Sequence, residues 1–334
     1  MSDSTALSTL RRLLLSVINA GVILLLLLLL ALAGSRLFHW EDSALVITAE
    51  SVSFYLFALG YPAMIFAVLA KRRPAILLSA IVILCHVFWV LPEFTASRSL
   101  PDEVAAAPKF TLLSHNVKFD NTDLPALEDS LRTATADVIF IQELSWEALQ
   151  PIRDTNALAQ YPYEVVEPAG AQGLGIFSKL PLHDAQLIQS AGFPTLRATI
   201  DVGGQRVTLY NVHAQSPVYG ATHFWQDDLA QLRTELHAET GPSIAAGDFN
   251  AGYGHRPFRE LLEHGWHDAH MDLGRGTART WPMDRLGGAN FNGYIRLDHV
   301  LTSPDVRATH IEETPGDGSD HRGLIADIAV LPPS

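Results

Sequence analysis

Three long apolar stretches dominate the first 92 residues of the chain. They cover about residues 13–33, 51–70 and 74–92, close to the roughly 20 apolar residues that a helix needs to cross a bilayer. The basic segment 71–73 between the last two is too short for anything but a tight hairpin. The pattern predicts a membrane anchor of three transmembrane helices in residues 1–92.

The pattern changes after this anchor. Residues 93–109 are rich in Ala, Ser and Pro without an apolar period, which is typical of a linker. From residue 110 to residue 331, short apolar runs alternate with amphipathic segments, of which His223–Thr240 is the clearest helix. Strand-like runs follow one another between Tyr163 and Val212 and favour antiparallel pairing. This order predicts a layered α/β domain over residues 110–331 rather than a doubly wound parallel sheet.

Five apolar runs of this domain carry polar residues at or beside their ends. They are FTLLSHN, VIFIQE, VTLYNVH, SIAAGDFN and IRLDHVL, and a polar GSDH segment follows near the C-terminus. The candidate site residues are Asn116, Glu143, His213, Asp248, Asn250, Asp298, Asp320 and His321. Strands that end in such groups build a polar cluster on a dry scaffold, as a metal-assisted hydrolase requires.

The residue types point to hydrolysis of a phosphate ester. A hard cation offsets the negative charge of such a substrate, and it prefers oxygen ligands. Glu143 is the best ligand candidate, while Asn116 either adds an amide oxygen or positions a neighbour. Asp248 and Asn250 are spaced i, i+2, so on an extended segment they point to the same side.

In this order the motifs resemble the endonuclease/exonuclease/phosphatase superfamily, which has the deoxyribonuclease I-like fold. The resemblance covers about residues 109–330 and rests on IQE, NVH, GDFN and GSDH together. It implies a four-layer α/β/β/α sandwich and hydrolysis of phosphodiesters or phosphomonoesters with Mg²⁺, or with Mn²⁺. It also implies that Asp320 completes the metal shell.

The resemblance further implies catalytic roles for five residues. Asp248 would hold the attacking water, and Asn250 would orient that water or a phosphate oxygen. Asp298 would fix the tautomer of His321. His213 would donate to a non-bridging phosphate oxygen and stabilise the charge of the transition state. The motifs do not determine which residue activates the water.

Positive charge near the ends of the apolar stretches predicts the topology. Arg11, Arg12 and the basic segment 71–73 would lie on one side, against Arg36 and Arg98 on the other. Five against two places the N-terminus in the cytoplasm and the domain outside a bacterial plasma membrane. Signal-peptide cleavage after the small residues 31–33 is the alternative for the first stretch. The lone Cys85 leaves the exported domain without a disulfide.

Charge also bears on the substrate. The net charge of −13 arises in residues 109–334, which hold 16 Lys and Arg against 29 Asp and Glu. Proteins that bind nucleic acid carry basic surfaces, so nucleic acid is the less favoured partner. An exported domain of this superfamily after three spans resembles the bacterial phosphatases associated with teicoplanin resistance, which act on undecaprenyl diphosphate. This resemblance implies a lipid-linked phosphate ester as substrate and the lipid bilayer as partner.

A loop over residues 274–296 alternates cations with aromatic rings. Arg279, Trp281 and Arg296 are its candidate substrate-binding residues, suited to a diphosphate and a prenyl chain. The alternative is a solvated loop whose arginines pair with acids of the domain. His299, next to Asp298 but on the opposite face of the strand, is expected to tolerate substitution.

Two other functions remain open at this stage. One is an extracytoplasmic nuclease or phosphodiesterase, which would show DNA cleavage with a steep salt dependence. The other is an inactive, membrane-tethered binding module, which would bind a ligand without Mg²⁺ and show no turnover.

Overall fold

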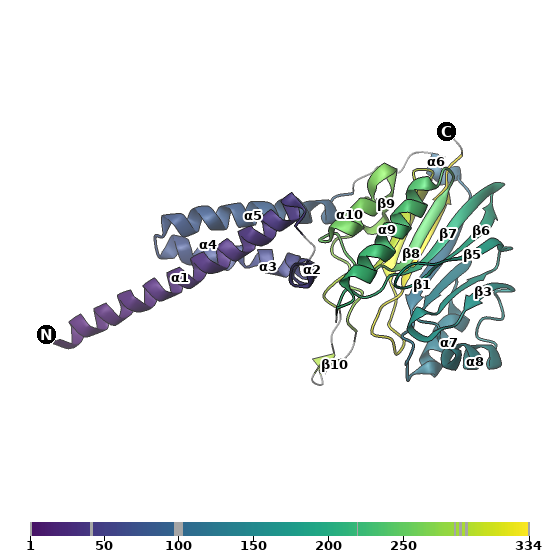
Figure 1. Cartoon of the computed structure of the whole chain (residues 1–334), viewed down its shortest axis with the longest axis horizontal. Helices are drawn as coiled ribbons and strands as arrows, with labels where there is room; N and C mark the ends of the chain where they lie inside the picture. Colours follow the sequence, from purple (N-terminus) through teal and green to yellow (C-terminus); the bar gives the residue numbers. More distant parts are fainter. Residues whose placement is uncertain are drawn as a thin grey trace. The chain divides into compact units, whose positions relative to one another are not determined.

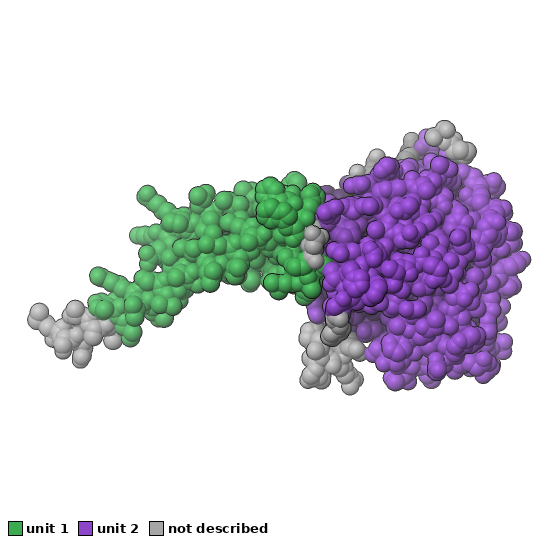
Figure 2. All heavy atoms as spheres, in the orientation of Figure 1, with its two compact units in different colours: residues 1–91 green, residues 92–334 purple. Residues whose placement is uncertain are grey.

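The computed structural model describes residues 2–40, 43–96, 103–218, 220–283, 285–286, 289–290 and 293–332. The chain divides into two compact units, Met1–Leu91 and Pro92–Ser334, which Figure 2 shows in green and purple. Of the predicted linker, residues 97–102 lie outside the described residues, and α6 (Glu103–Ala106) occupies part of the remainder.

The N-terminal unit is helical. Its helices are α1 (Ser2–Phe38), α2 (Ala44–Ser51), α3 (Ser53–Ala58), α4 (Gly60–Leu69) and α5 (Arg73–Phe94), the last of which ends in the second unit. Among the described residues, two segments are each long and apolar enough to cross a membrane: Ser8–Phe38 with mean hydropathy 2.9 and Arg73–Phe94 with 2.4. The structure therefore shows two candidate spans where the sequence predicted three.

A bend lies at the start of the predicted middle span. Ala44–Ser51 and Ser53–Leu69 pass the same test only as a pair, and they meet at a bend of 69°. The hydroxyls of Ser51 and Ser53 donate back to the carbonyls of Ile47 and Glu50, a kind of bond that bends helices. The bend therefore falls at the start of the predicted span over residues 51–70, and Ser53–Leu69 occupies the rest of that span.

One apolar cluster joins the helices of this unit. Its buried members are Leu26, Leu29 and Ala33 of α1, Phe57 of α3, Ala63 and Ala67 of α4, and Ala75 and Val82 of α5. Gly60 permits the close approach of α4 to α5, because a Cβ there would lie 2.9 Å from a methyl of Val82. The bent middle segment thus packs with both long helices.

Two six-stranded sheets form the centre of the second unit (Figure 1). Their strand orders are β13-β14-β1-β2-β4-β3 and β5-β6-β7-β8-β12-β9. The strands are β1 (Lys109–Asn116), β2 (Val138–Gln142), β3 (Tyr163–Glu167), β4 (Leu174–Ser178), β5 (His183–Ile188), β6 (Thr195–Val202), β7 (Gln205–His213), β8 (Ser243–Asp248), β9 (His267–Asp268), β12 (Asp298–Thr302), β13 (Val306–Glu313) and β14 (Leu324–Val330).

Alternation along the strands produces the layers. Leu112 of β1 packs in the core between the sheets, together with Ile244 and Val300 of the other sheet. Its neighbour Leu113 lies in a second cluster with Leu127 and other residues of the outer helices α7 (Leu124–Thr133) and α8 (Trp146–Asp154). This arrangement confirms the predicted α/β sandwich.

The remaining helices include α9 (Thr222–Ala238), α10 (Arg256–Leu261) and α11 (Ala269–Asp272). Phe258 of α10 packs on the ring of His299 in β12, with ring centroids 4.1 Å apart, so α10 contacts the second sheet. Shorter elements are the 3-10 turns η1 (Gly170–Gln172) and η2 (Glu263–Gly265) and the hairpin of β10 (Arg285–Leu286) and β11 (Ala289–Asn290).

Candidate active site

Strand register brings the polar strand ends to one edge of the sandwich. β1 and β2 run parallel with Asn116 opposite Gln142, and β7 and β8 run parallel with His213 opposite Asp248. β12 runs antiparallel to β8 and begins with Asp298 opposite Asp248. The GSDH segment precedes β14, whose first residue pairs near the end of β1. Carboxyl ends of parallel strands therefore meet the start of an antiparallel one.

Gly247, the first residue of the GDFN motif, lies where the backbone requires a glycine. Its φ is 142°, and a Cβ at this position would lie 1.9 Å from the carbonyl oxygen of Val212. Only glycine fits this close approach of β8 to β7. The glycine thereby keeps His213 and Asp248 side by side.

Asn116 connects the two sheets at the centre of the site. Its Nδ2 donates to Oε1 of Glu143 at 3.0 Å and to Oδ2 of Asp248 at 3.1 Å. Its Oδ1 accepts from the backbone N–H of Lys118 at 3.0 Å. With the amide in this orientation, its NH₂ group faces the acids. The geometry favours the positioning role of Asn116 over the role of an oxygen ligand.

Glu143 leaves β2 in a left-handed conformation, with φ of 57°. Its Oε2 accepts from the backbone N–H of Phe119 at 2.9 Å. The side chain is 16% exposed, whereas that of Asp248 is 1% exposed. Glu143 is therefore held in place from behind and stays accessible from the edge of the sandwich.

His321 and Asp298 form a buried pair. Nδ1 of His321 lies 2.9 Å from Oδ2 of Asp298, and its Nε2 lies 3.5 Å from Oδ2 of Asp248. The backbone N–H of His321 donates to Oγ of Ser319 at 3.1 Å. Since Asp298 is acceptor-only when ionised, Nδ1 carries the proton and Nε2 faces Asp248.

His213 lies across Asp248 from this pair. Its Nε2 is 3.7 Å from Oδ2 of Asp248 and 3.9 Å from Oε1 of Glu143. Phe193 packs edge-on against its ring, with centroids 5.0 Å apart. Asn250 donates from its backbone N–H to Oδ1 of Asp248 at 2.8 Å. His213, His321 and Asn250 thus converge on Asp248.

Burial shifts the titration of the cluster. It raises the pKa of Asp248 to about 7, because the ionised carboxylate loses its hydration. Burial alone would lower the pKa of His321, but the carboxylates of Asp298 and Asp248 outweigh it and raise that pKa to about 10. Burial lowers the pKa of His213. Near neutral pH, His321 is therefore cationic and His213 is neutral.

The fold and the motif order have counterparts in known proteins. A model of the Endonuclease/Exonuclease/phosphatase family matches residues 113–321, which include the predicted catalytic and metal residues. The chain belongs to this family. Its members are phosphoesterase- and nuclease-type hydrolases that depend on divalent metal ions.

Solved structures of the family share the fold with this chain. TDP2 of D. rerio, complexed with a single-strand DNA product, is similar with a TM-score of 0.57 and 20% identity over 66% of this chain and 99% of that one. A family protein from Leptotrichia buccalis gives 0.51 and 16% over 66% and 99%. A UPF0294 protein of Vibrio cholerae is 33% identical over 129 residues, which span 39% of this chain and only 36% of that protein.

The donor set of the edge fits the divalent cation of the family. Among the described residues, the three acids Glu143, Asp248 and Asp298 form ion pairs here with only two histidines, His213 and His321, so the acids at this edge outnumber their cationic partners. In addition, ligand atoms of Asp248, Asp298 and His321 all lie within 4.8 Å of one another. Clustered carboxylate oxygens suit a hard cation such as Mg²⁺.

A polar network under the edge was missed by the sequence analysis. Nε2 of Gln142 donates to Oδ1 of Asn211 at 2.6 Å and to Oγ of Ser114 at 3.1 Å. Asn211 in turn donates to the carbonyls of Ile141 and Gly175. These bonds join the sheets directly behind Asn116 and Glu143. The only sequence signal was two amides inside otherwise apolar strands.

Asp228 of α9 is a second residue that the sequence analysis missed. It accepts from the backbone N–H groups of Gly192, Phe193 and Gln215 at 2.8–2.9 Å. Because Phe193 packs on His213, Asp228 holds the loop that covers this histidine. From the helical pattern alone, Asp228 would be interpreted as a solvent-exposed acid.

The three predicted substrate-binding residues differ in their exposure and in their partners. Arg279 is exposed, and Nε1 of Trp281 donates to Oδ2 of Asp320 at 3.2 Å. Arg296 is buried with a side chain 7% exposed, and its Nη2 lies 2.9 Å from Oε2 of Glu93. This internal ion pair matches the alternative for the loop, in which its arginines pair with acids of the domain.

His299 has interior partners that the sequence did not reveal. It does face away from Asp298, but it is fully buried. Its Nδ1 lies 2.6 Å from Oδ2 of Asp268 and its Nε2 lies 2.9 Å from the carbonyl oxygen of Ala251. Substitution of His299 is therefore expected to reduce stability, because both ring nitrogens have partners in the interior.

Proposed function

We propose that the chain is a membrane-anchored, metal-dependent phosphatase of a lipid phosphate or diphosphate, such as undecaprenyl diphosphate. The observation that carries the proposal is the joining, in one chain, of a family catalytic edge to two long apolar helices. An anchored enzyme meets lipid substrates at the bilayer surface without having to extract them from solution.

The surface of the N-terminal unit supports anchoring. Large apolar side chains of α1 and α5 are exposed, including Leu24 at 58%, Leu28 at 60%, Leu84 at 68% and Phe88 at 71%. Soluble proteins rarely expose contiguous apolar patches of this kind. We therefore place these faces in the hydrocarbon of a bacterial plasma membrane.

The topology depends on the bent middle segment. With two crossings, the catalytic unit would share the side of the N-terminus, and with three it would lie opposite. We propose three, because the Ser53–Leu69 arm spans about 25 Å at 1.5 Å per residue and packs with both long helices. Its basic end at 71–73 then stays in the cytoplasm, and the catalytic unit lies outside.

The charge of the catalytic unit supports a lipid over a nucleic acid. Residues 109–334 hold 16 basic against 29 acidic side chains, which repels a polyphosphate backbone. The structural likeness to a TDP2 bound to DNA product makes an extracytoplasmic nuclease the second candidate. For a lipid phosphate or diphosphate substrate, Arg279 and Trp281 remain the proposed contacts.

The residues of the edge would divide the reaction among them. Asp248 would hold the water that attacks phosphorus, and Asn250 would fix the orientation of Asp248. His321, oriented by Asp298, is cationic near neutral pH and would stabilise the negative charge that grows on the phosphate oxygens. His213 would donate a hydrogen bond to a non-bridging oxygen. With a lipid diphosphate, the P–O bond between the attacked phosphorus and the bridging oxygen breaks, and the lipid monophosphate that leaves takes up the proton given up by the attacking water.

Glu143 and Asp320, with Asn116 beside them, would hold Mg²⁺, or Mn²⁺. The ion would offset the charge of the phosphate and thus permit attack by water. Asp298 and His321 are already bonded to each other, so we assign the ion to the Glu143 side.

A substrate panel tests the proposal. The full chain in detergent is incubated with Mg²⁺ and, separately, undecaprenyl diphosphate, a phosphoinositide, sphingomyelin and plasmid DNA, with Asp248→Asn as the inactive control. We expect phosphate release from the lipid diphosphate. Plasmid nicking without phosphate release would favour the nuclease, and no turnover on any substrate would favour the binding module.

Reporter fusions test the topology. Alkaline phosphatase and a fluorescent protein that folds only in the cytoplasm are fused in turn to the C-terminus. Three crossings predict phosphatase activity without fluorescence. Fluorescence without phosphatase activity would mean two crossings and would remove the extracytoplasmic substrate.

A further inference from the structure

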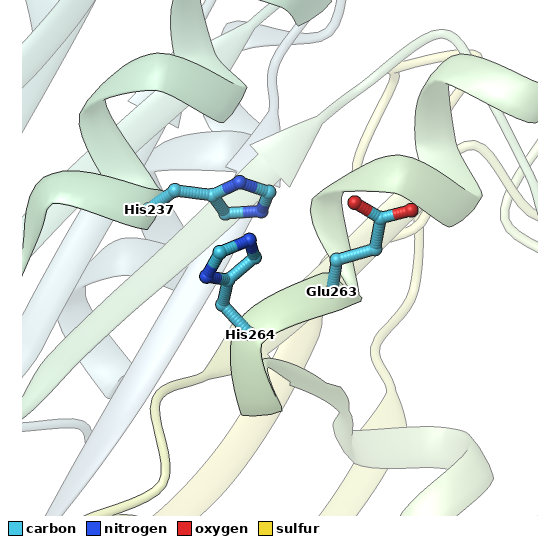
Figure 3. A group of neighbouring side chains, drawn as sticks. All are labelled: His237, Glu263 and His264. Atoms are coloured by element: carbon cyan, nitrogen blue, oxygen red, sulfur yellow. The ribbon is translucent and has the colours of Figure 1, made fainter.

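A second cluster of ligand-type side chains lies away from the catalytic edge. It comprises His237 in the last turn of α9 and Glu263 and His264 in η2, whose side chains Figure 3 shows turned toward one another. α9 follows β7 after its His213 end and leads to the start of β8 at Ser243. Because β7 and β8 are parallel, this helix returns the chain to the opposite edge of the sheet. The cluster is therefore separate from the catalytic site.

The three side chains have the spacing of a metal site. One ligand atom from each lies within 4.8 Å of the other two. The rings of His237 and His264 stack with centroids 4.3 Å apart and planes at 30°. Small side-chain rotations can bring two nitrogens and one carboxylate oxygen to a common ion.

His237 carries a second, independent sign of a missing partner. Its Nε2 is buried and has no hydrogen-bond partner among the described residues. An unsatisfied buried nitrogen is otherwise costly.

The surroundings are compatible with a cation. Arg233 is the nearby positive charge, but its guanidinium is engaged by the carboxylate of Glu260. Glu263 supplies the negative charge of the cluster and is exposed, so the ion can enter from solvent.

We propose that His237, Glu263 and His264 form a second metal site, selective for a borderline transition-metal ion such as Zn²⁺ over Mg²⁺. Imidazole nitrogens suit Zn²⁺, Cu²⁺ and Ni²⁺, whereas Mg²⁺ prefers oxygen. Three protein ligands leave one position of a tetrahedral Zn²⁺ site for water. The ion would tie the end of α9 to the segment between α10 and β9, and so stabilise the second unit.

The left-handed backbone of His264 guides the choice of variant. Its φ is 57° and its ψ is 25°, a conformation that Asn adopts more readily than Ala. His264→Asn thus removes the imidazole and keeps the turn. His183→Asn is the matched control, because His183 is an exposed histidine of β5 outside the cluster.

The test is equilibrium dialysis of the full chain in detergent against Zn²⁺, with Mg²⁺ in large excess to occupy the catalytic edge. We expect wild type and His183→Asn to bind one more equivalent of Zn²⁺ than His264→Asn, or to bind it at least about tenfold more tightly. Zn²⁺ should also raise the thermal unfolding temperature of the first two proteins more than that of the variant. Equal stoichiometry, affinity and thermal shift in all three would overturn the proposal.

Discussion

Nδ1 of His321 lies 2.9 Å from Oδ2 of Asp298, and both side chains are buried at the catalytic edge. The two residues come from segments that are adjacent only in the fold, since Asp298 begins β12 and His321 precedes β14. The bond fixes which nitrogen of His321 faces Asp248, so neither residue of the pair acts well without the other.

The pair should behave as one unit in mutants. We expect His321→Ala and Asp298→Ala each to lower kcat by roughly 10²–10³-fold, the usual loss when one group that stabilises the transition-state charge is removed. The double mutant should lose little more than either single mutant, because the residues share one function. The measurement is kcat for phosphate release, with circular dichroism to verify folding. Losses that multiply in the double mutant would show that the two residues act independently.

His299 should matter for stability and not for chemistry. His299→Ala leaves Asp268 as a buried carboxylate without its closest partner, so we expect the free energy of unfolding to fall by about 3–5 kcal/mol. Chemical denaturation in detergent measures this loss, with His310→Ala, an exposed histidine of β13, as the control. If the two variants proved equally stable, the buried pair would not contribute as described.

Glu143 should control the metal requirement. Glu143→Gln keeps the shape of the side chain but removes its charge, so the Mg²⁺ concentration for half-maximal activity should rise at least about tenfold. Glu147→Gln, an exposed acid of α8, is the control and should leave that concentration unchanged. An unchanged Mg²⁺ titration for Glu143→Gln would remove this residue from the metal site.

His321 should make the stability of the metal-free protein depend on pH. Because its folded-state pKa is raised to about 10, its contribution is complete below the unfolded value of about 6.5 and is lost as the pH rises. We expect the free energy of unfolding in EDTA to fall between about pH 7 and pH 10. His321→Ala should flatten this decline. A variant with the wild-type slope would exclude His321 as its source.

Much of the site could be predicted because it follows from strand ends. Asn116, Glu143, His213 and Asp248 end or follow apolar runs, and parallel pairing brings such ends together. The α/β sandwich follows from the same runs. These features depend on short stretches of sequence whose periodicity is visible without the fold.

The features that the sequence did not reveal have a different origin. Whether Arg296 is exposed depends on Glu93, which lies 203 positions away in the sequence. His299 was expected on the tolerant face of its strand, but α10 covers that face. The bend in the middle span depends on two serines that bond to the preceding turn. Each outcome depends on a tertiary or local hydrogen-bonding partner that hydrophobic patterning does not reveal.

The most direct measurement of metal-dependent lipid phosphatase activity is phosphate release from undecaprenyl diphosphate by the purified full chain, before and after EDTA and after Mg²⁺ is restored. We expect wild type to release phosphate, EDTA to abolish this release and added Mg²⁺ to restore it, whereas Asp248→Asn should release none under any of these conditions. Release that persists in EDTA, or that Asp248→Asn retains, would contradict a metal-dependent reaction at this edge of the sandwich.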